Sequence, residues 1–268
     1  EISGDEAELI GELLGFVKDA THQIEVMSWV ALSFGRLGVS YDVIGTDDVL
    51  VAGVRDAKRK FFLEQSAATI EQILVSNELQ GNTQTSWRRE LVTVRSSLGQ
   101  WGEAVKQMRV ILCDQKNVKS PFLQQDAADL FQKAARDSPS LEDSQEYFRT
   151  AVAGGRVMLA TGESVVWGWG GLANRVSKVA FGKRSDLSET MRTLYFESRF
   201  RLAACRLEWA QKETNVATKV QLMHDAEADI KIESQLHPGL GGVVLKERFE
   251  MLRVGIQQEF LKISESRK

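Results

Sequence analysis

Three regularly spaced arginines are the residues of this chain that most suggest a binding chemistry. Arg192, Arg199 and Arg206 recur every seven residues, which places them on one stripe of a helix. A guanidinium can bind a carboxylate through two parallel hydrogen bonds, so this stripe could hold an acidic peptide segment. Asn174 and Lys178 could join it if the preceding helix packs alongside.

The same arginines also fit a solvated helix face. Stripes of charge on helices usually face water, where acidic neighbours neutralise them. Three acidic residues on the same predicted helix could play this part: Glu189, Glu197 and Glu213. The sequence leaves both interpretations open.

A second unusual segment combines two tryptophans with several glycines. Trp167 and Trp169 flank Gly168, and Gly170 and Gly171 follow. Glycines let another backbone approach closely, so the segment could form an aromatic groove for a ligand or a partner helix. Tight helix packing, with the tryptophans in the core, explains the same pattern. Each glycine weakens a helix by about 1 kcal/mol relative to alanine, so packing must offset that cost or the helix is kinked.

Patterns that bind metals or carry out catalysis are missing from the sequence. His22, His224 and His237 stand apart and no Cys-x-x-Cys occurs, so we predict no zinc site. The glycine-rich residues 239–242 precede a helix, but a phosphate-binding loop needs a strand before its glycines. We therefore predict no metal, no cofactor and no enzymatic activity.

Composition narrows the class of protein further. The 268 residues are 43% hydrophobic and carry a net charge of −3, which suits one large domain or two small ones. Acids and bases are interspersed, so neither nucleic acid nor an anionic membrane is expected as a partner. No window reaches the roughly 18 apolar residues of a membrane span.

The apolar neighbours of Cys113 and Cys205 favour buried free thiols. The compartment stays open: the sequence starts at Glu1, and it fits a cytoplasmic protein or one exported with loss of a signal peptide.

Helical periodicity dominates the chain, and strand alternation is nowhere convincing. The pattern predicts roughly ten helices joined by short loops. A first helical region should end near residues 35–38. Longer segments of helical spacing cover residues 49–78, 165–181, 186–213 and 243–264.

Capping residues mark several helix ends. Ser120 before a proline, Ser140 and Asn215 each stand where an N-cap is expected. Gly81 and Gly154 follow apolar helical runs, as C-terminal glycines commonly do.

The most regular unit is a helical hairpin at residues 85–117, joined by a glycine-containing turn. A hairpin of this size cannot bury its apolar face alone and needs neighbours. The chain is therefore predicted to be a stack of helical hairpins.

This hairpin resembles the tetratricopeptide-repeat family. The family motif joins two helices through a glycine and aromatic turn, with a small residue early in the second helix and larger apolar residues one and two turns later. Five residues fall on those positions: Gly99, Trp101, Ala104, Met108 and Ile111. A weaker match ends at Pro238, with Ala226 and Ile230 in its second helix. Its first helix would carry Leu202, Ala203 and Leu207.

The resemblance implies an all-α fold, a right-handed superhelix of stacked antiparallel helical hairpins, also called a TPR-like α-solenoid. Residues 1–80 would form an N-terminal helical region and residues 81–268 the TPR-like hairpins, continuous with it. Such a fold presents a concave groove to a protein or peptide partner.

The leading functional hypothesis is thus a non-catalytic scaffold that mediates protein–protein interaction. A structural subunit of a stable complex or oligomer is one alternative, and an enzyme with a dispersed site is another. Membrane insertion is not expected, and self-association fits the architecture. The candidate partner-binding residues are Trp167, Trp169, Asn174, Lys178, Arg192, Arg199 and Arg206.

Overall fold

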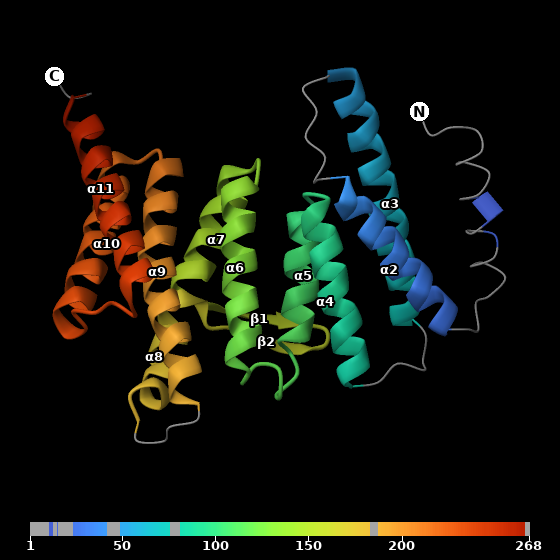
Figure 1. The fold of residues 1–268 in the computed structure, drawn as a ribbon, viewed down its shortest axis with the longest axis horizontal. Coiled ribbons are helices and arrows are strands. Elements are labelled where there is room, and N and C mark those ends of the chain that lie inside the picture. Colours follow the sequence, from blue (N-terminus) through green and yellow to red (C-terminus); the bar gives the residue numbers. More distant parts are fainter. Residues whose placement is uncertain are drawn as a thin grey trace. The chain divides into compact units, whose positions relative to one another are not determined.

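The computed structural model describes residues 11–12, 15, 24–41, 49–75, 81–182 and 187–265; His22 lies outside these ranges. The described residues form ten helices and one two-stranded sheet, which confirms the all-α prediction (Figure 1). The chain divides into two compact units, Glu1–Ile111 and Leu112–Lys268.

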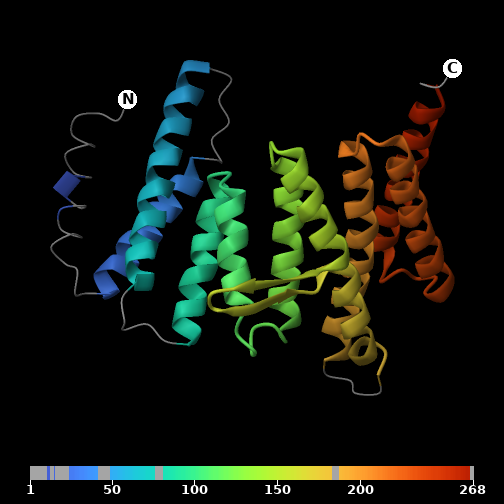
Figure 2. The ribbon, with the colours of Figure 1, turned by 180° about the vertical axis from the view of Figure 1, so that it is seen from behind.

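Four described helices make up the first unit: α2 (Ile24–Ser40), α3 (Val49–Val75), α4 (Asn82–Ser97) and α5 (Trp101–Ile111). Each packs against the next along the chain, and Figures 1 and 2 show α4 and α5 running side by side. The boundary predicted after residue 80 falls inside this unit, because the helices before and after it, α3 and α4, pack together.

The helix predicted at residues 49–78 is described as far as Val75, because residues 76–80 lie outside the described ranges. Gly81, predicted to close that helix, instead stands at the N-cap of α4 with φ of 60°.

Two glycines bring α2 and α3 unusually close. The sequence placed the end of a helix near residues 35–38, yet α2 continues to Ser40 with both Gly35 and Gly38 buried. A Cβ on Gly38 would lie 2.6 Å from Cγ of Leu63 on α3. The glycines therefore act here as contact points for a neighbouring helix rather than as helix stops.

Replacing Gly38 with alanine should destabilise the first unit. We expect Gly38→Ala to lower the free energy of unfolding by about 1–3 kcal/mol, because the added methyl overlaps Leu63. Gly53→Ala is the matched control, since Gly53 is an exposed α3 residue with open space around its Cα. It should be neutral, or stabilising by up to about 1 kcal/mol. Urea denaturation followed by circular dichroism measures both, and equal stabilities would contradict the close contact.

A glycine turn joins α4 to α5. Gly99 has φ of 71°, a left-handed conformation that glycine adopts without strain. The apolar positions of α5 are buried as their spacing predicted: Ala104, Met108 and Ile111. The helix predicted to continue to residue 117 ends at Ile111. Beyond it, the Asp114 carboxylate accepts a 2.7 Å hydrogen bond from the Lys116 backbone, a local bond that competes with helix.

The second unit contains the remaining elements: α6 (Pro121–Asp137), α7 (Leu141–Ala153), β1 (Gly155–Leu159), β2 (Gly162–Val166), α8 (Gly168–Ala180), α9 (Ser188–Lys212), α10 (Val216–Leu236) and α11 (Val243–Glu265). The predicted caps are confirmed. Ser120, Ser140 and Asn215 accept hydrogen bonds from the first turns of their helices, and Gly154 ends α7 with φ of 81°. Cys205 is buried as predicted, whereas Cys113 is only partly buried.

A short hairpin is the main departure from the predicted elements. The helix predicted at residues 165–181 begins at Gly168, and Val165 and Val166 belong to β2, which pairs antiparallel with β1. Figure 2 shows this hairpin leading into α8.

Tertiary contacts explain the departure. The buried amide of Gln124 on α6 donates to the carbonyl of Val165 and accepts from the backbone N–H of Trp167, both at 2.8 Å. Gly168 has φ of 65°, and a Cβ there would lie 2.8 Å from the carbonyl oxygen of Thr150. A side chain on α6 thus holds the backbone extended just before the helix starts.

Candidate functional site

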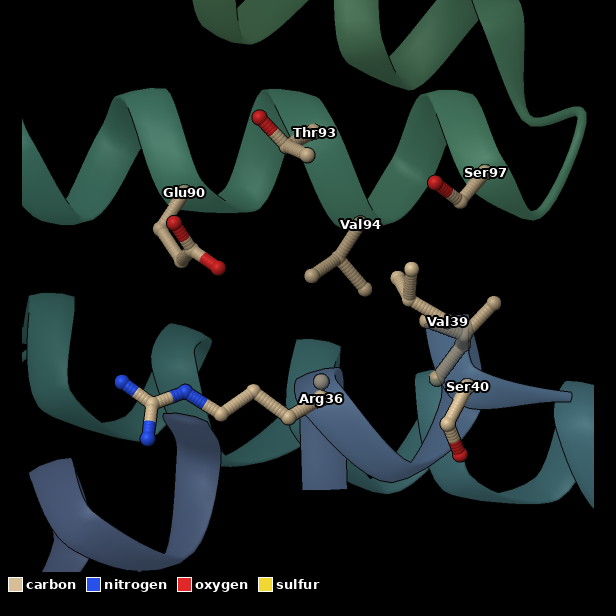
Figure 3. A pocket seen from close by; sticks show the side chains of 9 residues that line it. Arg36, Val39, Ser40, Glu90, Thr93, Val94 and Ser97 are labelled. Atoms are coloured by element: carbon tan, nitrogen blue, oxygen red, sulfur yellow. The ribbon is translucent and has the colours of Figure 1, made fainter. Parts of the chain in front are cut away.

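A groove in the first unit is a candidate binding cavity among the described residues. It has a volume of about 310 Å³ and lies between α2 and α4 over α3 (Figure 3). Nine residues line it: Gly35, Arg36, Val39, Ser40, Leu63, Glu90, Thr93, Val94 and Ser97.

The groove has an apolar floor and a polar rim. Leu63 and Val94 are buried at its base, with exposed fractions of 0% and 2%. Ser40, Thr93 and Ser97 line its walls (Figure 3). The Ser40 and Thr93 hydroxyls donate hydrogen bonds to backbone carbonyls of their own helices. The close α2–α3 contact shapes the groove. Because Gly35 and Gly38 carry no side chains, the α2 backbone lies close to α3 at the groove floor.

Two opposite charges stand at one end of the groove. Arg36 on α2 and Glu90 on α4 occupy facing walls (Figure 3). Neither makes a hydrogen bond or ion pair with another described residue. Arg36 is exposed and Glu90 is half-buried. The groove can therefore offer a ligand one cation, one carboxylate, the Ser97 hydroxyl and an apolar floor.

Sequence reasoning did not identify these groove residues. Arg36 stands in the stretch interpreted as the end of a helix, and Glu90 lies within the regular hairpin among other polar residues. The available signal was the pair of glycines on α2, which indicates close helix packing as well as a helix stop.

The tryptophan segment lies mainly in the core. Trp169 is 1% exposed, and its indole N–H donates a 2.9 Å hydrogen bond to Oε1 of Gln132. Trp167 is half-buried at the start of α8, and the Arg175 guanidinium lies 4.6 Å from the centre of its ring. Of the two tryptophans, only Trp167 offers surface to a partner.

The arginine stripe lies against α10. The Nε of Arg199 donates a 2.9 Å hydrogen bond to Glu233, and Arg206 pairs with Asp229. Arg192 donates a 2.7 Å hydrogen bond to the carbonyl of Ala180, at the end of α8. The predicted neighbours Asn174 and Lys178 are exposed on α8. A partner's carboxylate would have to displace the existing contacts of these arginines.

The acids that neutralise the stripe come from α10 rather than from α9 itself. Asp225, Asp229 and Glu233 recur every four residues, so they share one face of α10. Matching this spacing to that of the arginines could have indicated a paired interface between the two helices.

Glu233 is the buried centre of this interface. Its side chain is 0% exposed and also accepts a 3.1 Å hydrogen bond from the Tyr195 hydroxyl. Its Oε1 has no hydrogen-bond partner and lies 3.8 Å from Nε2 of His237. Burial and the nearby Glu233 charge raise the pKa of Tyr195 to about 12. Burial also raises the pKa of Asp229, although Arg206 and Arg199 oppose the rise.

Removing the Glu233 carboxylate should destabilise the second unit strongly. We expect Glu233→Ala to lower the free energy of unfolding by about 3–5 kcal/mol, because Arg199 and Tyr195 lose their buried acceptor. Lys231→Ala, an exposed residue on the same helix, should change it by less than about 0.5 kcal/mol. Thermal and chemical unfolding measure both variants. A Glu233→Ala protein as stable as the control would show that the network does not hold α9 to α10.

A second network joins α9 to α11. Arg248 donates two hydrogen bonds to Glu197, at 2.7 and 3.1 Å, and Arg201 donates one at 2.8 Å. Burial alone would raise the pKa of Glu197, but these hydrogen bonds outweigh it and hold the pKa below its ordinary value of 4.5.

The lowered pKa predicts loss of stability in acid. Unfolding of the chain returns the pKa of Glu197 to its ordinary value of 4.5. The stability that the Glu197 carboxylate contributes is therefore present above pH 4.5 and is lost as the pH falls through the lower pKa of the folded state. Glu197→Gln should therefore reduce the free energy of unfolding by about 1–2 kcal/mol at pH 7 and by much less at pH 3. Urea titrations across this pH range test the claim, and a difference independent of pH would refute it.

Among the described residues, no three or more histidine, cysteine or acidic side chains are placed to hold a metal ion. None of the helices described is long and apolar enough to cross a membrane.

Comparisons with known proteins assign no family to this chain. Protein-family models, curated proteins and solved structures were each searched, and none matched the chain. The resemblance to tetratricopeptide repeats thus rests on the hairpin at residues 85–117 and on the weaker match that ends at Pro238.

Proposed function

We propose that this chain is a non-catalytic, TPR-like helical protein that binds a peptide segment of a partner protein in the groove between α2 and α4. The observation that carries the proposal is the combination, in one groove of about 310 Å³, of an apolar floor and two opposite charges that pair with no other described residue. Sites that recognise ligands characteristically combine apolar walls with a few placed polar groups.

The apolar floor would receive one side chain of the peptide. Leu63 and Val94 form its base and Val39 closes one end (Figure 3). An aliphatic or aromatic side chain buried there would supply most of the affinity, as anchor residues do at protein interfaces.

The polar groups would orient the peptide. The Ser97 hydroxyl lies on α4 within the groove lining, where it can hydrogen-bond to the backbone of an extended segment. Arg36 would pair with an acidic residue and Glu90 with a basic one. The expected ligand is therefore a short segment with an apolar anchor beside residues of both charges.

Peptide selection followed by charge exchange tests this proposal. A displayed peptide library is selected on the whole chain, and titration calorimetry measures the best peptide. We expect Arg36→Glu and Glu90→Lys each to weaken binding by about tenfold or more, since each places like charges together. Exchanging the matching charge in the peptide should restore the affinity.

The control is Lys106→Glu, which reverses a charge that is 66% exposed on α5 and should leave the affinity within about twofold. Selected peptides that bind all variants equally would contradict the groove assignment. A chain that selects no peptide, while a small molecule raises its melting temperature, would contradict the proposed function itself.

A further inference from the structure

The last helix of the second unit exposes an apolar stripe. Phe249 and Ile256 bury the inner face of α11, with exposed fractions of 1% and 0%. The opposite side carries four large apolar residues that are 48–73% exposed: Val244, Met251, Val254 and Leu261. Figure 1 shows α11 beside α10 at the end of the second unit.

The spacing of this stripe is that of a helix-pairing seam. Together with two polar residues, the stripe reads Val244, Glu247, Met251, Val254, Gln258 and Leu261, with alternating steps of three and four residues. This 3-4 alternation keeps residues on the face where two helices pack side by side. The seam thus has four apolar positions and two polar ones.

The polar positions are placed symmetrically. If a second α11 runs antiparallel, with the seam centred between Met251 and Val254, apolar residues meet apolar ones. Val244 then faces Leu261 of the other copy and Met251 faces its Val254. Glu247 faces Gln258, whose amide can donate a hydrogen bond to the carboxylate. The two-fold axis at the centre relates each of these pairs to an identical pair on its other side, as a self-complementary interface requires.

A parallel arrangement fits the same residues less well. In register, it places Glu247 against Glu247 of the other copy, and two like charges in a desolvated layer repel each other. The polar residues of the seam therefore select both the orientation and the partner.

We infer that α11 is the dimerisation surface of this chain, pairing antiparallel with α11 of a second copy. Packing on α9 and α10 already holds the helix in shape, so pairing does not require it to fold first. The inference is independent of the proposed peptide binding, because the groove and α11 belong to different units.

Sedimentation velocity on the full chain tests the association. We expect a concentration-dependent dimer in the wild type. A Met251→Glu and Val254→Glu double variant should raise the dimer Kd by about 100-fold or more, because it places four carboxylates in the central layers. Both side chains are exposed in the single chain, so its circular dichroism should stay unchanged. Its melting temperature should equal that of the wild type when both are measured at concentrations well below the dimer Kd.

Met158→Glu is the matched control, since Met158 is 75% exposed on β1 and far from the seam in sequence. It should dimerise as the wild type does. A monomeric wild type at about 100 µM, above the Kd expected even for a small interface, would overturn the inference. The inference would also be overturned if the double variant still dimerised. It would fail as well if the chain stayed monomeric and its seam bound only a different protein.

Disulfide trapping tests the orientation. Glu247→Cys and Gln258→Cys chains are made separately and mixed under mild oxidation. Antiparallel pairing predicts a crosslink between the two variants in the mixture and little in either alone, because the two positions face each other across the axis. A crosslink formed by Glu247→Cys alone, absent from the wild type with its native Cys113 and Cys205, would indicate parallel pairing and overturn the assignment.

Discussion

The packing of α9 against its neighbours is the interaction on which the second unit depends. This helix contacts α6, α7, α8, α10 and α11, so its polar side chains cannot all reach water. A buried polar group is costly unless it has a partner, and α10 and α11 supply those partners. Glu233 and Asp229 meet Arg199 and Arg206, while Arg248 meets Glu197. The arginines that suggest a binding surface in the sequence thus have a structural role between helices.

In the first unit, the corresponding constraint is the close approach of α2 to α3. Gly35 and Gly38 remove the side chains that would keep the helices apart, and Leu63 occupies the space. The same contact shapes the groove between α2 and α4, where Arg36 and Glu90 stay unpaired with any described residue. Gly35 and Leu63 therefore belong both to the α2–α3 contact and to the groove lining. Binding of the proposed ligand would thus be coupled to the stability of this unit.

Helix pairing links the proposed surfaces to the way the chain is built. In repeat-like architectures, an apolar stripe on a helix is buried against a neighbouring helix. The outer face of α11 carries such a stripe without a described neighbour to cover it. A second copy would satisfy the same rule that joins the helices within each unit. The groove, in contrast, would recognise a segment by its charges as well as by its apolar surface.

The sequence by itself determined the helices and many of their ends. Periodicity, and caps such as Ser120 and Asn215, act within one or two helical turns, so local rules suffice to predict them. Tertiary structure decided the rest. Val165 is in a strand because Gln124, distant in sequence, bonds to its backbone, and the arginine stripe is paired because α10 lies against it. Single-sequence patterns carry no information on which helix faces meet, and both the groove and the buried network are made where they meet.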